Sequence, residues 1–202
     1  MTAFPWGDFG LNLLISAVAV VIFFGLVMAI GVALKDHSII DISWGPSFVA
    51  IAVVSWFASG ASGSPGDTAR RALVLALTAI WGLRLGAYIG HRNLGKGEDP
   101  RYTALLRHRT GPLFPFLVKR IYGLQAVLAF IVSVPVQFAM YEARGIDGLA
   151  CVGIALWVIG FGFEAIGDWQ LARFKADERN AGRIMDRGLW AWTRHPNYFG
   201  DA

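Results

Sequence analysis

The sequence predicts an all-α fold, a polytopic transmembrane helical bundle with five spans and the N-terminus outside. Three observations lead to this prediction. Of the 202 residues, 55% are hydrophobic and only 16% are charged, whereas soluble domains usually carry about 25% charged residues. The charged residues are crowded between five long apolar blocks. The basic residues are also unevenly distributed among the connecting segments, and this distribution sets the orientation.

Each apolar block approaches the roughly 20 residues that a helix needs to cross about 30 Å of hydrocarbon. The first block exceeds the apolar region of a signal peptide and has no basic residue before it, so we interpret it as a true span. The Gly/Ser/Pro-rich segment 60–69 is expected to be an external loop. The predicted spans are residues 11–34, 42–59, 71–90, 120–141 and 147–167.

The basic residues predict which face is inside. Thirteen of the eighteen Lys and Arg residues lie in segment 91–120 and in the tail after the fifth span. With five spans both segments fall on one side, which the positive-inside rule assigns to the cytoplasm. We therefore expect residues 1–202 to form a single integral membrane domain in which 168–202 are cytoplasmic. The membrane would be the cell (inner) membrane in a bacterium or the endoplasmic reticulum in a eukaryote.

The same composition bears on the partners of the chain. Membrane lipids are expected partners, whereas nucleic acid is not, because no soluble basic domain is present to hold it. A lipid-like small molecule that enters from the bilayer is the expected substrate class. The sequence does not set the oligomeric state.

Small residues within the apolar blocks are interpreted as packing positions. Gly82, Gly86 and Gly90 recur at four-residue spacing in the third span, and this pattern favours close approach of another helix. Cys151 is the single cysteine, so an intramolecular disulfide is excluded. It is expected to be a small packing residue in an apolar run.

Two charged residues in or beside the spans need a physical reason. A charge that faces lipid costs at least about 2.5 kcal/mol, so Arg84 should face the bundle interior, a partner carboxylate or a wet cavity. Asp41 opens the second span, where a carboxylate suits the positive end of the helix dipole. Helix capping and a functional role both remain open for Asp41.

Glu164 and Asp168 stand one helical turn apart near the end of the fifth span. Lys175 shares their face if the helix continues beyond the membrane. Two neighbouring carboxylates repel each other unless a positive or hydrogen-bonding group answers them. The group is therefore either an internal salt-bridge network or a polar binding site at the membrane face.

The strongest local pattern is the run from Arg187 to Gly200. His195-Pro196 is typical of the cap and first turn of a new helix. Arg194, His195 and Asn197 then gather at a helix start, where free N–H groups favour an anion, and Arg183 and Arg187 are close in sequence. This pattern favours a phosphate-bearing cofactor.

These residues resemble a known family. The motif Glu164-x-x-x-Asp168-x-Gln-Leu, followed by Gly188-Leu-Trp and Arg194-His-Pro-Asn-Tyr-Phe-Gly200, resembles the C-terminal domain of the steroid 5α-reductase family, in particular its uncharacterised bacterial branch. The Asp41-x-x-Trp-Gly, Arg84-x-Gly-x-Tyr88 and Glu98-Asp-x-Arg-Tyr102 patterns fit that branch too. The Arg-His-Pro-x-Tyr piece also occurs in isoprenylcysteine carboxyl methyltransferases.

The resemblance implies a bundle of about seven helices, so that further spans would follow Ala202, and a reductase that uses NADPH. Glu164 stands where an amide is usual in the steroid enzymes, and Lys175 stands where an arginine is usual. The cofactor-binding residues that it implies are Glu164, Asp168, Arg173, Lys175, Arg194, His195, Asn197, Tyr198 and Asp201.

The resemblance is weaker at the catalytic positions. Steroid reductases polarise the substrate carbonyl with a glutamate and a tyrosine, but Trp44 and Trp81 fall at those positions here. Asp41 lies one turn from Trp44, and Tyr88 lies two turns beyond Trp81. Asp41 or Tyr88 is therefore the expected catalytic donor of a hydrogen bond to a developing enolate.

Three functions remain in competition. The leading hypothesis is an NADPH-dependent membrane reductase of a C=C bond conjugated to a carbonyl in a steroid-like or other lipid substrate. The second is a lipid or prenylcysteine methyltransferase that uses S-adenosylmethionine. The third is a non-catalytic membrane scaffold or lipid-binding protein.

Overall fold

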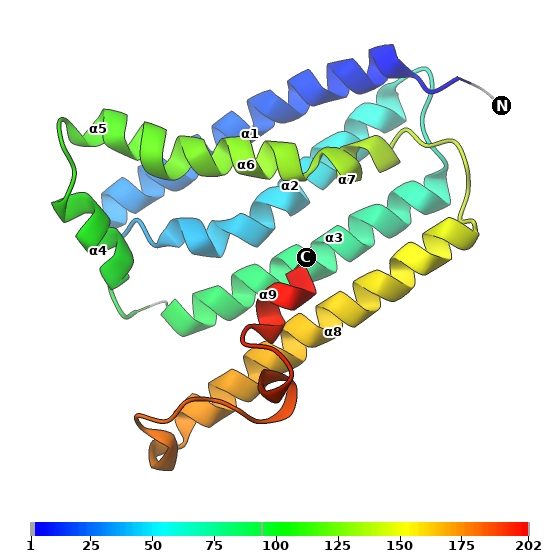
Figure 1. The fold of residues 1–202 in the computed structure, drawn as a ribbon. Helices are drawn as coiled ribbons and strands as arrows, with labels where there is room; N and C mark the ends of the chain where they lie inside the picture. The colour runs from blue at the N-terminus through cyan, green and yellow to red at the C-terminus, as the bar shows by residue number, and fades with distance from the viewer. Residues whose placement is uncertain (1–2, 94, 202) are drawn as a thin grey trace. The chain divides into compact units, whose positions relative to one another are not determined.

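The fold is helical in a computed structural model that describes residues 3–93 and 95–201, except for the side chain of Asp201. No strand occurs among these residues (Figure 1). Five of their helices are long and apolar enough to cross a membrane, which confirms the predicted fold class. The sidedness of the chain stays a prediction. The helices group into two compact units, Met1–Gly145 and Ile146–Ala202.

The first three spans are single helices that extend past the apolar blocks. Their helical hydrogen bonding continues into polar flanking residues, which belong to the water-exposed ends of the spans. The short turn between the first two contains His37 and Ser38, both of which are buried. The helices are α1 (Trp6–Leu34), α2 (Ile39–Ala61) and α3 (Thr68–Asn93).

A short helix, α4 (Pro100–Arg107), follows α3 outside the predicted spans. Asp99 caps it by accepting a hydrogen bond from the Arg101 backbone N–H at 2.8 Å. Pro100 occupies the first helical position, where its missing N–H costs nothing. The helix therefore has a well-defined start, although hydropathy alone assigned this segment to a loop.

The fourth span begins seven residues before the predicted position and is not one regular helix. It consists of α5 (Leu113–Phe116), the π-helical turn η1 (Leu117–Tyr122), α6 (Gly123–Val132) and α7 (Val134–Ala139). A Cβ at Gly123 would collide with the carbonyl oxygen of Val118, so the wide turn requires glycine there. The break at Ser133 precedes Pro135, which lacks an N–H for the helical ladder.

In the second unit, α8 (Gly148–Ala176) continues nine residues past the predicted end of the fifth span. This extension supports the shared helix face expected for Glu164, Asp168 and Lys175. The tail then forms η2 (Glu178–Asn180), η3 (Gly188–Ala191) and α9 (Pro196–Asp201). Cys151 is exposed on α8, so its expected role as a packing residue is wrong.

The closest helix contact of the first unit joins α2 and α3 through glycines. An added Cβ at Gly82 would lie 2.5 Å from the Gly45 carbonyl oxygen, and one at Gly86 would lie 2.9 Å from the Pro46 ring. All three glycines are buried. The predicted packing role is therefore confirmed for Gly82 and Gly86.

A chain of hydrogen bonds crosses the interior of the first unit between α1 and α7. Asn12 Nδ2 donates to Gln137 Oε1 at 3.1 Å, and Gln137 Nε2 donates to Ser133 Oγ at 3.0 Å. All three side chains are buried. Because hydrocarbon offers no alternative partners, such groups must bond to one another, and they tie the first span to the fourth.

We expect Gln137→Leu to destabilise the protein by about 1–2 kcal/mol, because the Asn12 amide would lose its acceptor inside the bundle. The double variant Asn12→Leu/Gln137→Leu removes both partners and should recover most of that loss. The free energy of unfolding in detergent tests this. A double variant that is as unstable as the sum of the single variants would contradict the network.

Candidate functional site

Two buried carboxylates and an amide form the polar centre of the second unit. Glu164 and Asp168 on α8 are 1% and 3% exposed. Asn197, in the first turn of α9, donates from Nδ2 to Asp168 Oδ1 at 3.3 Å. The Asn197 Oδ1 atom is buried and has no hydrogen-bond partner in the part of the chain that the structure describes. Two of the predicted cofactor residues, Asp168 and Asn197, thus lie side by side, and the Asn197 Oδ1 atom can accept a further hydrogen bond.

Small residues bring α9 onto α8. Gly167 lies under the ring of Pro196, with 3.1 Å between its ideal Cβ position and Pro196 Cγ. Further along, an added Cβ at Gly160 would lie 2.6 Å from the Gly200 carbonyl oxygen. The order of these contacts shows that α9 runs antiparallel to α8. These glycines thus permit the close approach that places Asn197 beside Asp168.

The segment before α9 is tied to the same helix by two hydrogen bonds. The Trp190 indole donates from Nε1 to the Gly167 carbonyl oxygen at 3.0 Å. The Leu189 backbone N–H donates to Gln170 Oε1, also at 3.0 Å. Gly188, at φ +60°, lies against the Gln170 amide and has no room for a side chain. These contacts fold the tail back along α8.

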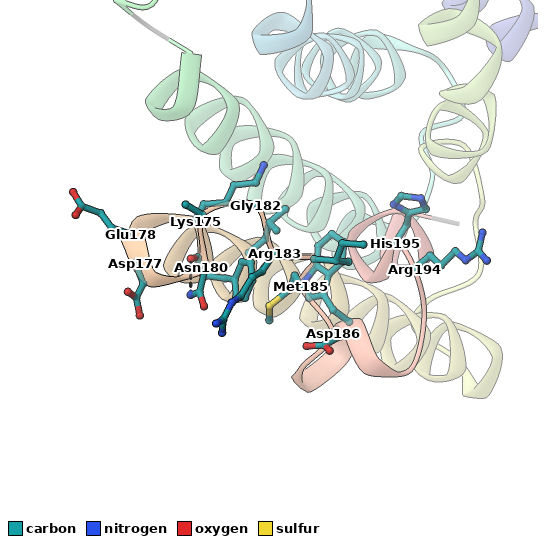
Figure 2. Close-up of a pocket in the computed structure, with 15 residues that line it drawn as sticks. Lys175, Asp177, Glu178, Asn180, Gly182, Arg183, Met185, Asp186, Arg194 and His195 are labelled. Atoms are coloured by element: carbon teal, nitrogen blue, oxygen red, sulfur yellow. Dashed lines mark hydrogen bonds between the residues drawn. The ribbon is translucent and has the colours of Figure 1, made fainter.

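The folded tail encloses a pocket with a volume of about 1030 Å³, which is large enough for a nucleotide-sized molecule. Figure 2 shows Lys175 and the Glu178–Asn180 turn at one end of the pocket and Arg194 and His195 at the other. The lining also contains apolar side chains from α8 and the tail. The full lining comprises Leu171, Phe174, Lys175, Asp177, Glu178, Asn180, Ala181, Gly182, Arg183, Ile184, Met185, Asp186, Trp190, Arg194 and His195.

The pocket is lined by three cations and by three carboxylates, those of Asp177, Glu178 and Asp186. Lys175, Arg183 and Arg194 line it, and among the described residues none of the three forms an ion pair. The carboxylate of Asp177 is already engaged, because Arg179 donates to it at 2.8 Å. That guanidinium holds the pKa of Asp177 below its usual range. Three unpaired cations in one hollow are a suitable donor set for phosphate groups.

Not every predicted cofactor residue lies in this pocket. Arg173 points elsewhere, with its guanidinium 5.1 Å from the centre of the Trp169 ring, and it does not line the hollow. Tyr198 is 68% exposed and lies edge-on to His195, with ring centres 5.5 Å apart. The side chain of Asp201 lies outside the described residues. Of the predicted cofactor residues, Lys175, Arg194 and His195 line the pocket, whereas Glu164, Asp168 and Asn197 do not.

The sequence interpretation did not place Arg183 and Trp190 among the binding residues. Arg183 follows Gly182, whose φ of +75° reverses the chain. Asn180 Nδ2 donates to the Phe174 carbonyl oxygen at 3.0 Å and fixes the same turn against the end of α8. Gly182 was the available signal in the sequence. Glycine adopts positive φ readily and therefore often marks a chain reversal.

In the first unit, Asp41 is held by two donors from α4. The Tyr102 hydroxyl donates to Asp41 Oδ1 at 2.6 Å, and Arg101 Nη2 donates to Asp41 Oδ2 at 2.9 Å. Burial, and then the hydrogen bond to Asp41, raises the pKa of Tyr102, so this phenol stays protonated. The side chain of Asp41 therefore anchors α4 to α2, and the capping interpretation is replaced by a tertiary contact.

A second polar contact lies at the same end of the unit. His37 Nδ1 and the Tyr122 hydroxyl are 2.9 Å apart, and the His37 backbone N–H donates to Glu98 Oε1 at 3.0 Å. A Cβ at Gly31 would collide with the Tyr122 hydroxyl. The turn between α1 and α2, the segment before α4 and the fourth span are thereby joined.

Tyr88, the other predicted catalytic residue, lies between two cations on α3. The guanidinium carbons of Arg84 and Arg92 are 5.4 and 5.8 Å from the centre of its ring. Positive charge near the phenol stabilises negative charge on its oxygen. Arg84 is partly buried and is therefore turned toward protein, as expected for a charge within a span.

Comparison with known families covers most of the chain. The family described as "Protein of unknown function (DUF1295)" matches residues 27–202. The chain belongs to the DUF1295 family. Both polar clusters of this DUF1295 protein, around Asp41 and around Asp168, lie within the matched range. No curated protein and no solved structure matches the chain.

Proposed function

We propose that this chain is a membrane-embedded, NADPH-dependent reductase that acts on a C=C bond conjugated to a carbonyl in a steroid-like or other lipid substrate. The observation that carries the proposal is a pocket lined by Lys175, Arg183 and Arg194, none of which forms an ion pair among the described residues, in the same unit as the buried Asp168–Asn197 pair. The motifs shared with the steroid 5α-reductase family support it.

The residues of the second unit suit the parts of this cofactor. Lys175, Arg183 and Arg194 would hold its phosphate groups by charge-assisted hydrogen bonds. Asp168 and the free acceptor Asn197 Oδ1 would accept hydrogen bonds from hydroxyl or amide groups. Bound NADPH would supply the hydride for the reduction.

The first unit would activate the substrate. Tyr88 is the proposed donor of a hydrogen bond to the substrate carbonyl, since Arg84 and Arg92 favour the negative charge that its oxygen gains as it donates. Asp41 accepts two hydrogen bonds from α4, so we assign it a positioning role: it keeps α4 and α2 together.

Titration of the full chain with NADPH tests this function. Trp190 lines the pocket, so NADPH should quench the tryptophan fluorescence, and Trp190→Phe should remove much of that quench. S-adenosylmethionine should give no response. A response to S-adenosylmethionine without one to NADPH would establish the methyltransferase alternative instead. Binding of neither compound would favour the scaffold.

A further inference from the structure

A groove in the first unit is separate from the cofactor pocket of the second. It lies where α4 meets the start of the fourth span. Two adjoining hollows of about 470 and 240 Å³ share Leu105 and Arg120 in their linings. The larger one is lined by Leu105, His108, Thr110, Pro112, Pro115, Phe116, Lys119 and Arg120. The groove thus combines cations with an apolar wall.

The cations of the groove lack acidic partners. Neither Lys119 nor Arg120 pairs with a carboxylate among the residues that the structure describes. The two acidic residues of the preceding segment are engaged elsewhere: Glu98 accepts the His37 backbone N–H, and Asp99 pairs with Arg101 at 3.0 Å. The groove therefore carries uncompensated positive charge.

The position of the groove along the span points to a lipid headgroup. The fourth span from Leu113 to Ala139 has 27 residues, so it is about 40 Å long and reaches through the hydrocarbon into the headgroup layers. Lys119 and Arg120 stand about 10 Å along it from Leu113. Phe114, which precedes them, is 65% exposed. The remaining stretch from Arg120 to Ala139 is about 30 Å long, enough to cross the hydrocarbon by itself, so the two cations stand at its edge, where lipid phosphates lie.

An exposed apolar track continues from the groove. Leu124, Val127 and Ile131 are exposed on α6 and follow Arg120 at helical spacing. A phosphate held at Arg120 would leave its acyl chains beside this track. A soluble anion has no acyl chains to contact this apolar track, so the arrangement favours a whole phospholipid.

We propose that this groove binds an anionic phospholipid of the leaflet that faces the basic loops. Lys119 and Arg120 hold the headgroup phosphate, and the Thr110 hydroxyl is available as a further donor. Basic pockets between spans and cytoplasmic segments recognise such headgroups by charge. The proposal is independent of the reductase function, since it uses none of the residues assigned to cofactor or substrate.

Native mass spectrometry of the full chain in detergent, with phosphatidylglycerol or phosphatidylcholine added, tests the groove. The unaltered protein should retain phosphatidylglycerol in clear preference to phosphatidylcholine. Lys119→Gln/Arg120→Gln should weaken phosphatidylglycerol binding roughly twenty-five-fold, because each cation near an anionic lipid contributes about fivefold. Both side chains are exposed, so this variant should fold normally.

The matched control is Lys96→Gln/Arg107→Gln, which removes the same charge from the same segment but does not touch the groove. It should bind phosphatidylglycerol within twofold of the unaltered protein. An equal loss in both double variants would show general surface attraction and overturn the site. Equal retention of the two lipids, or displacement of phosphatidylglycerol by an equal amount of glycerol 3-phosphate, would overturn it too.

Discussion

Arg183→Gln/Arg194→Gln should bind NADPH at least about hundredfold more weakly than the unaltered protein. Each guanidinium is expected to donate charge-assisted hydrogen bonds to the cofactor phosphates, and each such bond contributes about 1.5–3 kcal/mol. Both residues line the pocket and are exposed to it, so the folded unit should persist. Isothermal titration of the purified chain with NADPH measures the effect.

The matched control is Arg173→Gln/Arg187→Gln. It changes the net charge equally and lies in the same unit, but neither residue lines the pocket. Its NADPH affinity should stay within a few-fold of the unaltered value, because only long-range electrostatics change. Unaltered NADPH binding in both double variants would show that NADPH does not bind in this pocket. An equal loss of NADPH affinity in both double variants would show that the effect depends on net charge alone.

Gly82→Leu should lower the free energy of unfolding by about 3 kcal/mol or more. Its side chain would press on the Gly45 carbonyl and on Val49 Cγ2, both within 3 Å of the ideal Cβ position, and buried overpacking of this kind typically costs about 1–3 kcal/mol. Backbone atoms cannot rotate aside as a flexible side chain can. Denaturation in mixed micelles measures the change.

Gly25→Leu is the control for the glycine contact. Gly25 is exposed on α1, and nothing lies within 4 Å of its ideal Cβ position. This substitution should change stability by less than about 1 kcal/mol and in the favourable direction, since leucine is a better helix former than glycine. A control that is as unstable as Gly82→Leu would show that the loss does not depend on the α2–α3 contact.

Hydropathy was sufficient for the five spans because each needs only an apolar length that matches the bilayer. It was insufficient to locate the start of the fourth span, which lies at Leu113 and not at residue 120. The stretch from Leu113 to Arg120 contains one proline and two cations, which lower the local hydropathy, but tertiary contacts of Leu117 and Ile121 still hold it as helix. The packing of these side chains offsets the free-energy cost of the π-helical turn. A hydropathy value averaged over a sequence window does not report such packing.

Arg71 is a second case in which position along the chain was misleading. It is the first residue of the predicted span 71–90. The structure buries it at the start of α3, where Nη2 donates to the Trp56 carbonyl oxygen at 2.6 Å and the guanidinium stacks on the Trp56 ring at 4.4 Å. Its partner is fifteen residues away on another helix, so no local pattern indicated the contact.

The candidate site was predictable where it depends on one helix and unpredictable where it depends on chain reversal. Glu164 and Asp168 share a face of α8 because they are one turn apart. The inclusion of Arg183 and the exclusion of Arg173 follow instead from the turn at Gly182 and from the ring of Trp169. Contacts between segments therefore decide which residues line the pocket, and the pattern within one helix does not contain them.

The π-helical turn at Leu117–Tyr122 couples the orientations of side chains on two sides of the fourth span. A π-helical turn accommodates an additional residue, and each residue corresponds to about 100° of helical phase. The same phase offset seats Tyr122 beside His37 and directs Lys119 and Arg120 into the groove. A ligand that tightens or unwinds this turn would therefore rotate Tyr122 together with Lys119 and Arg120. Binding at the membrane surface would in this way be coupled to the position of the α1–α2 turn.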